Sequence, residues 1–351
     1  MYILISLLIF GVIIAIHEFG HYIAAKAFRV GVPEFAIGMG PKVLQKQGKE
    51  TLYTLRAIPV GGFCTLDGDD NEVQGEKSLF TKPLWQRIII FASGSVLNIA
   101  SGFLVLVLLA SALPGLTTTT LTGFADGFPL EGEQGFLAGD RFHRIDGIRV
   151  YQNSNIGLLL HLSEGDTVDI VVIRDGQQVA LNNLPLQRQI FEGSDTPRFG
   201  FYFDVNQYPT FSDRVAYAFN DLRDFTRQLP LTIRLLASGQ AGVEDISSVV
   251  GIVDIMHQAG TTADTAGLAA MRLAMLAALI SISVAVINLV PIPGLDGGRI
   301  FLAVVSTGIE KVTRRKLDPK YENYLNTAGL LLLFGFMIFI VLNDIIRIAG
   351  R

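Results

Sequence analysis

Two histidines and a glutamate form the pattern HEFGH inside the first apolar segment, as His17, Glu18 and His21. Residues four apart lie on one face of a helix, so both imidazoles can bind the same metal ion. A carboxylate beside two such ligands is placed to act as the general base of a zinc protease. The pattern predicts metal-assisted hydrolysis. Two buried histidines around an unrelated carboxylate are the alternative, which is costly in an apolar span.

The sequence offers a third metal ligand from another apolar segment, because a catalytic zinc ion takes three protein ligands and one water. Residues 288–300 read NLVPIPGLDGGRI, and Pro291 and Pro293 cannot continue a helix. We therefore expect Asp296 on a non-helical stretch at the end of a membrane span, where irregular backbone must be buried in protein. A carboxylate there needs a partner such as zinc; an ordinary Asp-Gly turn outside the membrane is the alternative. Three glycines are expected to let the backbone turn: Gly294, Gly297 and Gly298.

The composition is that of a membrane protein. Hydrophobic residues make up 50% of the 351 residues and charged residues only 17%, below the roughly 25% that is usual in soluble domains. A bilayer is crossed by about 20 apolar residues, and four segments are long enough: 3–28, 87–113, 268–291 and 325–348. These predict a polytopic α-helical membrane protein with about four transmembrane helices. A net charge of −4 gives no reason to expect nucleic acid.

A glycine-rich loop with strand-like segments follows the first span. The stretch ETLYTLRAIPV is rich in β-branched residues and alternates in polarity, so it predicts short strands. Gly61 and Gly62 come directly after it, and glycine within a strand indicates that another backbone approaches closely. Two interpretations stay open: an ordinary hairpin, or a sheet edge beside the metal site that pairs with an extended substrate.

Residues 116–205 have the pattern of a small soluble domain with short strands. Turn signals lie at Asp146-Gly147 and Asp175-Gly176. The run GFLAGDRFHRIDGIRV, a helical stretch near 153–162 and the run DTVDIVVIRDGQ follow one another in this region. This order resembles a PDZ domain, a module that binds extended peptides by strand addition.

The stretch 211–240 has apolar residues at helical spacing with charged residues between them, which predicts an amphipathic helix. Pro230 is expected to kink or break it. The helix would pack on the soluble domain or lie on the outer membrane surface, and its place just before a span favours the surface.

The sequence predicts four regions. Residues 1–113 contain two membrane helices, the HExxH motif and the β-loop, and residues 116–205 form the PDZ-like domain. Residues 206–267 are an amphipathic helical linker, and residues 268–351 contain two membrane helices and the LDG motif.

The distribution of basic residues predicts the orientation in the membrane. The loop from 29 to 87 and the loop before the last span are basic, whereas the stretch from 114 to 267 contains no lysine. Basic loops stay in the cytoplasm. Both termini and the PDZ-like domain are therefore expected outside the cytoplasm, with the metal site towards the cytoplasmic side. The basic residues are Lys42, Lys46, Lys49, Arg56, Lys77 and Lys82 in the first loop and Lys311, Arg314, Arg315, Lys316 and Lys320 in the second.

HEFGH, IPVGGF and NLVPIPGLDGG together resemble the site-2 protease family of intramembrane zinc metalloproteases, and within it the bacterial regulators of sigma-E protease type. The segments AIGMG at 36–40 and GSVLN at 94–98 extend the likeness. The resemblance implies one zinc ion on His17, His21 and Asp296, with Glu18 as the base. It also implies a substrate or oxyanion contact for Asn288, and a β-loop that presents substrate through Gly61, Gly62 and Phe63.

The same resemblance implies single-span membrane proteins as substrates in the bacterial inner membrane, such as anti-sigma factors and remnant signal peptides, trimmed beforehand by a site-1 type protease. This chain has room for one PDZ domain where better-known relatives have two. A non-catalytic membrane scaffold that holds partners through its PDZ domain is the alternative function. A zinc carrier is a further alternative, and Asp344 is the additional ligand that it could use.

Overall fold

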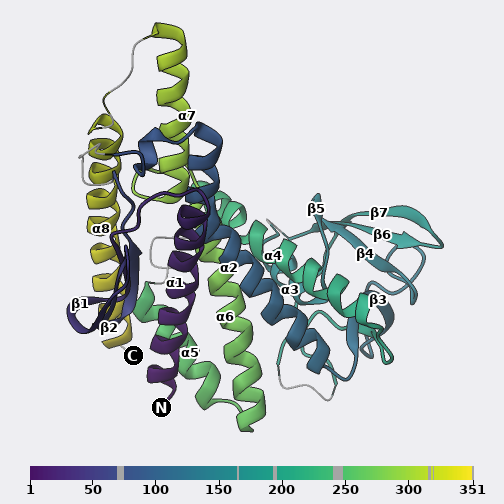
Figure 1. The fold of residues 1–351 in the computed structure, drawn as a ribbon. Helices are drawn as coiled ribbons and strands as arrows, with labels where there is room; N and C mark the ends of the chain where they lie inside the picture. Colours follow the sequence, from purple (N-terminus) through teal and green to yellow (C-terminus); the bar gives the residue numbers. More distant parts are fainter. Residues whose placement is uncertain are drawn as a thin grey trace. The chain divides into compact units, whose positions relative to one another are not determined.

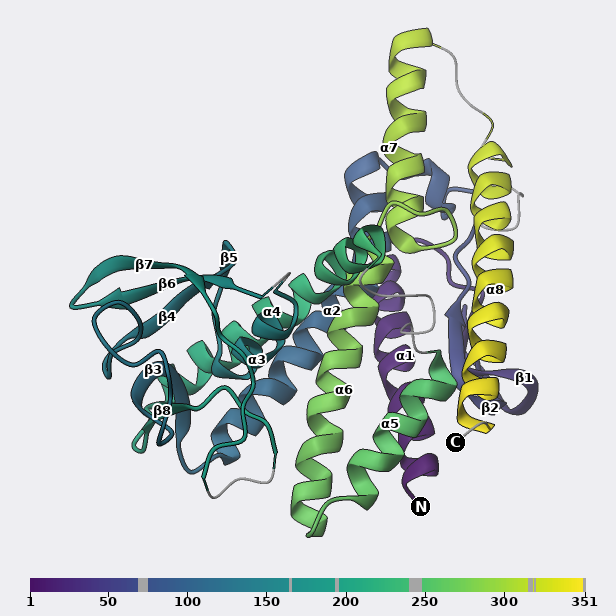
Figure 2. The ribbon, with the colours of Figure 1, turned by 180° about the vertical axis from the view of Figure 1, so that it is seen from behind.

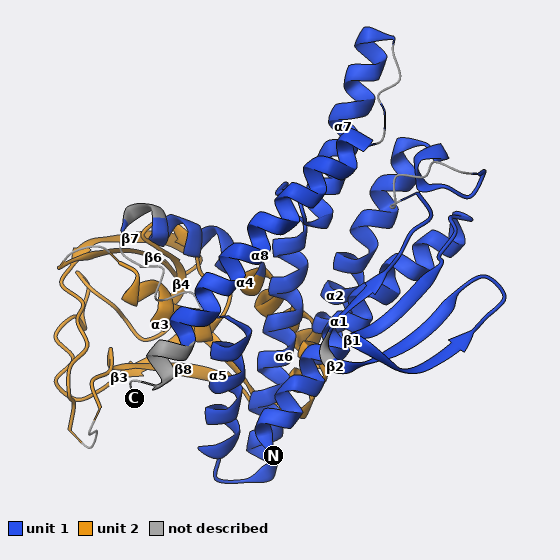
Figure 3. Ribbon diagram, turned by 90° about the vertical axis from the view of Figure 1, so that its left-hand side faces the viewer, with its two compact units in different colours: residues 1–105, 226–351 blue, residues 106–225 orange. Residues whose placement is uncertain are grey.

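A computed structural model describes residues 1–351 except 69–74, 164–165, 193–195, 240–247, 315–317, 319 and 350–351. Arg315 and Lys316 of the predicted basic loop and residues 240–247 of the predicted linker thus lie outside the described residues. The chain forms two compact units (Figure 3). We call residues 1–105 with 226–351 the helical unit and residues 106–225 the sheet unit.

The described residues include four helices that are long and apolar enough to cross a membrane, which confirms the predicted number. They are α1 (Tyr2–Ala27), α2 (Leu84–Ala112), α6 (Ala266–Asn288) and α8 (Lys320–Ala349). Their ends differ from the predicted spans by a few residues: all four helices begin before the predicted start, and α6 ends at Asn288, ahead of Pro291 and Pro293, which cannot continue a helix.

Two helices of the helical unit were not expected. A short helix, α5 (Val249–Thr261), lies against α1 (Figures 1 and 2). The buried residues that join α1, α5 and α6 are Phe10, Ile13, Met256, Leu273 and Ile280. The other unexpected helix, α7 (Asp296–Thr313), begins at the predicted metal ligand itself. A 3₁₀ turn, η1 (Leu79–Thr81), precedes α2.

The predicted strand-rich loop is a small sheet of β1 (Glu34–Gln47) and β2 (Leu52–Cys64), which lies beside α1. The residues from Glu34 to Ile37 pair with those from Leu52 to Leu55, and the end of β1 folds back along the same part of β2. The end of β2, from Gly62 to Cys64, pairs with the other side of the first β1 residues. Shifts of register thus divide each of the two long strands into two paired segments, so that the sheet has four segments. The end of β2 forms one edge of this sheet.

The sheet unit contains β3 (Leu116–Phe124), β4 (Arg141–Ile145), β5 (Ile148–Arg149), α3 (Asn153–His161), β6 (Val168–Arg174), β7 (Gln177–Leu184) and β8 (Phe201–Asn206). The strand order is β7-β6-β4-β3-β8, with β5 paired to β4. Both residues of Asp146-Gly147 and Asp175-Gly176 have positive φ, as tight hairpin turns require. Phenylalanines fill the core, where Phe136, Phe142 and Phe201 make mutual ring contacts.

The predicted amphipathic helix is α4 (Phe211–Ser238), and it continues through Pro230. Of the kink or break expected at Pro230, the break is therefore wrong. Proline removes one hydrogen bond from a helix, but the residues on both sides of Pro230 stay helical despite this loss. Whether α4 contacts a membrane surface remains a prediction.

Candidate metal centre

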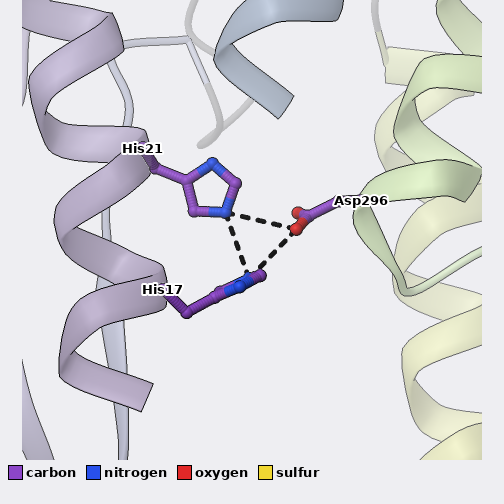
Figure 4. Close-up of side chains that lie close together, drawn as sticks. All are labelled: His17, His21 and Asp296. Atoms are coloured by element: carbon purple, nitrogen blue, oxygen red, sulfur yellow. Dashed lines mark hydrogen bonds and ion pairs between the residues drawn. The ribbon is translucent and has the colours of Figure 1, made fainter. Parts of the chain in front are cut away.

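The two histidines of HEFGH point their rings to one side of α1, as the four-residue spacing predicts (Figure 4). Both side chains are buried, and their Nε2 atoms lie 3.3 Å apart. His21 Nδ1 lies 2.8 Å from the carbonyl oxygen of Ile90 in α2, so that this nitrogen carries the proton and donates it. The bond fixes the ring and leaves Nε2 without a proton, so that this atom can bind a metal ion, and metal-bound histidines usually have such a support.

Asp296 brings a carboxylate oxygen to the same point from a distant part of the sequence. Its Oδ2 atom lies 3.1 Å from His17 Nε2 and 3.2 Å from His21 Nε2. In tetrahedral coordination, zinc bonds of about 2.05 Å place ligand atoms about 3.3 Å apart. The buried Oδ2 atom makes no hydrogen bond, so its lone pairs are available to a cation. In the described part of the chain these residues form a group of three that could hold a metal ion, and their spacing fits zinc.

Glu18 lies between this triangle and the small sheet. Its side chain is partly buried, and its carboxylate accepts a hydrogen bond from the backbone N–H of Cys64 in β2. A Cβ atom on Gly62 would lie 3.5 Å from Glu18 Cγ, so the glycine at the sheet edge is a direct neighbour of the glutamate. Glu18 is thus available as a base on the side of the metal site where the edge of β2 lies.

Asn288 also reaches the site. It is the last residue of α6, and its Nδ2 atom lies 3.4 Å from His17 Nε2. An amide N–H₂ group at that position can donate to an oxygen atom next to the metal. Of the three β-loop residues, Gly62 contacts Glu18, Gly61 has a φ of +97° that favours glycine, and Phe63 packs its ring on Arg56.

The expected backbone around Asp296 needs correction. Asp296 is the first residue of α7 and not part of a non-helical stretch, and the irregular backbone ends with Leu295 at the N-cap. Gly294 turns the chain with a φ of +99°. Gly297 and Gly298 lie inside the helix, where a Cβ atom would collide with the carbonyl groups of the preceding segment. They therefore permit close packing of the segment on α7 instead of a sharp turn.

Gly94 of α2 is a residue of the site to which the sequence assigned no role. A Cβ atom there would lie 2.5 Å from His21 Nε2 and 2.8 Å from His17 Cε1. Only glycine leaves room for both rings at this position. The pattern GSVLN drew attention to the segment, but nothing in it shows that the glycine faces the histidines, because that contact joins two different helices.

Charged residues hold the small sheet together beside the site. Glu34 accepts hydrogen bonds from Thr54 Oγ1 at 2.8 Å and from Arg56 Nη2 at 2.9 Å, and Lys42 Nζ lies 3.7 Å away. Burial raises the pKa of Glu34, but the hydrogen bonds from Arg56 and Thr54 and the charge of Lys42 outweigh it and hold the pKa below its ordinary value. The carboxylate therefore stays ionised and links β1 to β2.

Comparison with known proteins gives consistent matches. A sequence model described as peptidase family M50 matches residues 5–336. A Clostridium perfringens protein named "Putative zinc metalloprotease" is 31% identical over 346 residues, which are 99% of each chain. A Fusobacterium nucleatum protein of the same description is 30% identical over 351 residues, 97% of this chain and 98% of its own. The "Regulator of sigma-W protease RasP" of Bacillus subtilis is 24% identical over 423 residues and 97% of both chains. The family match includes every residue of the metal centre.

Proposed function

The chain belongs to peptidase family M50 and is a zinc metalloprotease, and we propose that it cleaves single-span membrane proteins within or near their transmembrane segment, as a site-2 type protease does. One observation carries this proposal: His17 and His21 of α1, a helix long and apolar enough to cross a membrane, converge within 3.3 Å with Asp296, which follows the membrane-capable helix α6 in the sequence. Ionisable residues within apolar membrane segments mark functional sites, and a hydrolytic metal site there acts on a substrate that reaches the same depth.

The residues of the site have separate roles in peptide hydrolysis. His17, His21 and Asp296 would hold the zinc ion, which when bound would supply a water of lowered pKa and polarise the scissile carbonyl group. Glu18 accepts the proton of the attacking water and later donates it to the leaving amine. Asn288 donates its amide N–H to the carbonyl oxygen, on which negative charge develops. Glu18 is not a zinc ligand in this scheme, which makes it separable from metal binding by mutation.

The edge of β2 serves as a docking strand for the substrate. A peptide bond in a membrane helix is shielded and already hydrogen-bonded, so the helix must be locally unwound before hydrolysis. Pairing with Gly61, Gly62 and Phe63 offsets part of that cost by replacing the lost backbone hydrogen bonds. The contact between Gly62 and Glu18 supports this assignment, because it brings a paired substrate strand beside the base.

We infer that residues 116–205 form a PDZ-like domain outside the cytoplasm, with both termini on the same side and the metal centre near the cytoplasmic side. We also propose that the chain is divided into four regions, residues 1–113, 116–205, 206–267 and 268–351.

The PDZ-like domain would admit substrates that a site-1 type protease has shortened, such as membrane-anchored anti-sigma factors. The name of the Bacillus subtilis relative supports this class of substrate. Deletion of 116–205 should then permit cleavage of untrimmed substrate, and unchanged selectivity would rule out gating.

Co-expression with a tagged single-span protein tests the proposed reaction. Wild type should produce a shortened fragment, and Glu18→Gln should not, although it should retain its zinc. The alternative of a non-catalytic scaffold predicts the same fragments and the same cellular phenotype for both. Identical fragments from wild type and Glu18→Gln would therefore reject the proteolytic function.

A further inference from the structure

The segment that carries Asp296 rests on the last helix, α8. The backbone N–H of Gly294 donates a hydrogen bond of 2.9 Å to Asn326 Oδ1. A Cβ atom on Gly294 would lie 2.7 Å from the backbone nitrogen of Leu330. From the opposite side, a Cβ atom on Gly329 would collide with the carbonyl group of Pro293. Two glycines thus face each other where the backbone of the segment meets the backbone of α8.

The same face of α8 is anchored to two further helices. Glu322 accepts hydrogen bonds from Arg87 Nη2 of α2 at 2.6 Å and from Ser306 Oγ of α7 at 2.5 Å. The Arg87 and Glu322 side chains are 9% and 17% exposed, so water screens this pair little. Glu322, Asn326 and Gly329 follow one another at intervals of four and three residues and lie on one side of the helix. We call them the contact face of α8.

Most other apolar side chains of α8 are exposed in the helical unit. Relative exposures are 55% for Leu325, 67% for Leu331 and 55% for Phe334. Those side chains suit contact with lipid, which makes no demand on their precise shape. The contact face is different, because a hydrogen bond and two mutually fitted glycines define one position of the segment against the helix.

We propose that Asn326 and Gly329 of α8 are positioning residues that set the place of Asp296 in the metal centre. This rests on the proposed role of Asp296 as a zinc ligand. Asp296 follows Gly294 by two residues, so a shift of the segment moves the carboxylate with it. Zinc–ligand distances tolerate deviations of only about 0.2 Å. An added methyl group at Gly329 must displace Pro293 by more than that, because the nearest atoms belong to rigid backbone.

The test compares Gly329→Ala with Gly335→Ala in the purified full-length protein. Both substitutions lie on α8, but a Cβ atom at Gly335 meets nothing within 4 Å. Alanine favours a helix equally at both places, so helix stability cannot explain a difference. Chelator competition should show zinc affinity reduced about 10–100-fold in Gly329→Ala, as for other residues that orient ligands, and unchanged in Gly335→Ala. Equal affinity of the two variants would overturn the proposal.

Asn326 provides a second test that adds no bulk. Asn326→Asp keeps an acceptor oxygen for the Gly294 N–H and should retain zinc affinity, whereas Asn326→Leu should lower it. Cobalt(II) bound in place of zinc reports the coordination directly, since displacement of Asp296 changes its visible absorption. An unchanged spectrum and affinity in Asn326→Leu would contradict a positioning role, even if Gly329→Ala failed to fold.

Asp296→Ala separates the failure of this proposal from failure of the proposed function. If Asp296→Ala binds zinc like wild type, the assignment of the ligand itself is wrong. If Asp296→Ala loses zinc while Gly329→Ala and Asn326→Leu behave like wild type, only the role of α8 is rejected. When both roles hold, Gly329→Ala adds no further loss in the Asp296→Ala background, because the two substitutions act through one contact.

Discussion

The proposed metal centre is built from two halves that the fold holds in different ways. His17 and His21 stand on one continuous helix, and the helical repeat alone brings their Nε2 atoms within 3.3 Å. Asp296 is the first residue of α7 and directly follows a segment that depends on contacts with α8. The first half is therefore set by local geometry and the second by long-range packing. Substitutions in α8 should therefore disturb the second half and leave the first in place, whereas the first half is sensitive to α2, which contacts both histidines.

Removal of a ligand is expected to have the largest effect, and it should be equal for both halves. Apparent binding free energies of zinc sites are roughly 10–16 kcal/mol, and loss of one ligand in three lowers affinity on the order of 10³-fold. His17→Ala and Asp296→Ala should both lose zinc during purification, as measured by elemental analysis. His161→Ala, at an exposed position in α3 of the sheet unit, is the control. Full zinc content in Asp296→Ala, with zinc lost from His17→Ala, would show that Asp296 does not belong to the metal site.

Asn288 should affect catalysis and leave metal binding intact. Loss of one donor to a developing oxyanion lowers kcat about 10²–10³-fold. Asn288→Ala should show this decrease in a cleavage assay with its zinc content unchanged. If zinc is lost together with activity, the amide near His17 supports the histidine and not the substrate.

Gly94→Ala should disturb the histidine half from outside its own helix. The added methyl group would crowd His21 Nε2, so zinc affinity should fall about 10–100-fold. Gly308→Ala in α7 is a suitable control, because a Cβ atom there meets nothing within 4 Å. An affinity equal to that of the control would mean that α2 can move away from α1 without cost.

The smallest effect on zinc binding is expected from a change in the charge of Asp221, a residue of α4 in the sheet unit. Burial, together with the charge of Asp224, raises the pKa of Asp221 to about 7. Because the folded pKa is the higher one, the stability that this group contributes is complete below about pH 4 and is lost as the pH rises through 7. The loss is on the order of 4 kcal/mol.

Hydrogen exchange of the full-length protein at pH 5 and pH 8 can measure this effect. Wild-type strands β3 to β8 should lose protection at pH 8, and Asp221→Asn, which cannot ionise, should not. Zinc content should be the same in both proteins. A pH-independent wild type would show that Asp221 is ionised in the fold without penalty.

The sequence predicts the parts of this molecule that depend on local pattern. Apolar length gave the four membrane-capable helices, and the four-residue spacing gave the histidine pair. Asp296 was identified because a carboxylate beside prolines at a membrane span needs a partner. Its contact with the histidines depends on long-range packing, which the sequence does not show. Pro291 and Pro293 predict a non-helical stretch, but α7 begins only three residues after Pro293, at Asp296 itself.

Close approaches between helices leave no pattern in the sequence. Gly94 and Gly329 look like ordinary glycines of apolar spans, and only the structure shows the ring atoms and the carbonyl group that face them. Proline misleads in the opposite way, because it gives a strong local signal that the structure does not follow. Pro230 breaks an isolated helix, but α4 continues through it to Ser238. Tertiary packing decides the case of the two glycines.

Zinc-edge X-ray absorption of Asp296→Cys tests most directly whether the two halves share one metal ion. A thiolate in the place of the carboxylate binds zinc with a bond of about 2.3 Å, which is clearly longer than bonds to nitrogen or oxygen. The spectrum should gain one sulfur neighbour at that distance and keep two imidazoles. A zinc-loaded variant with only nitrogen and oxygen neighbours would contradict the shared site.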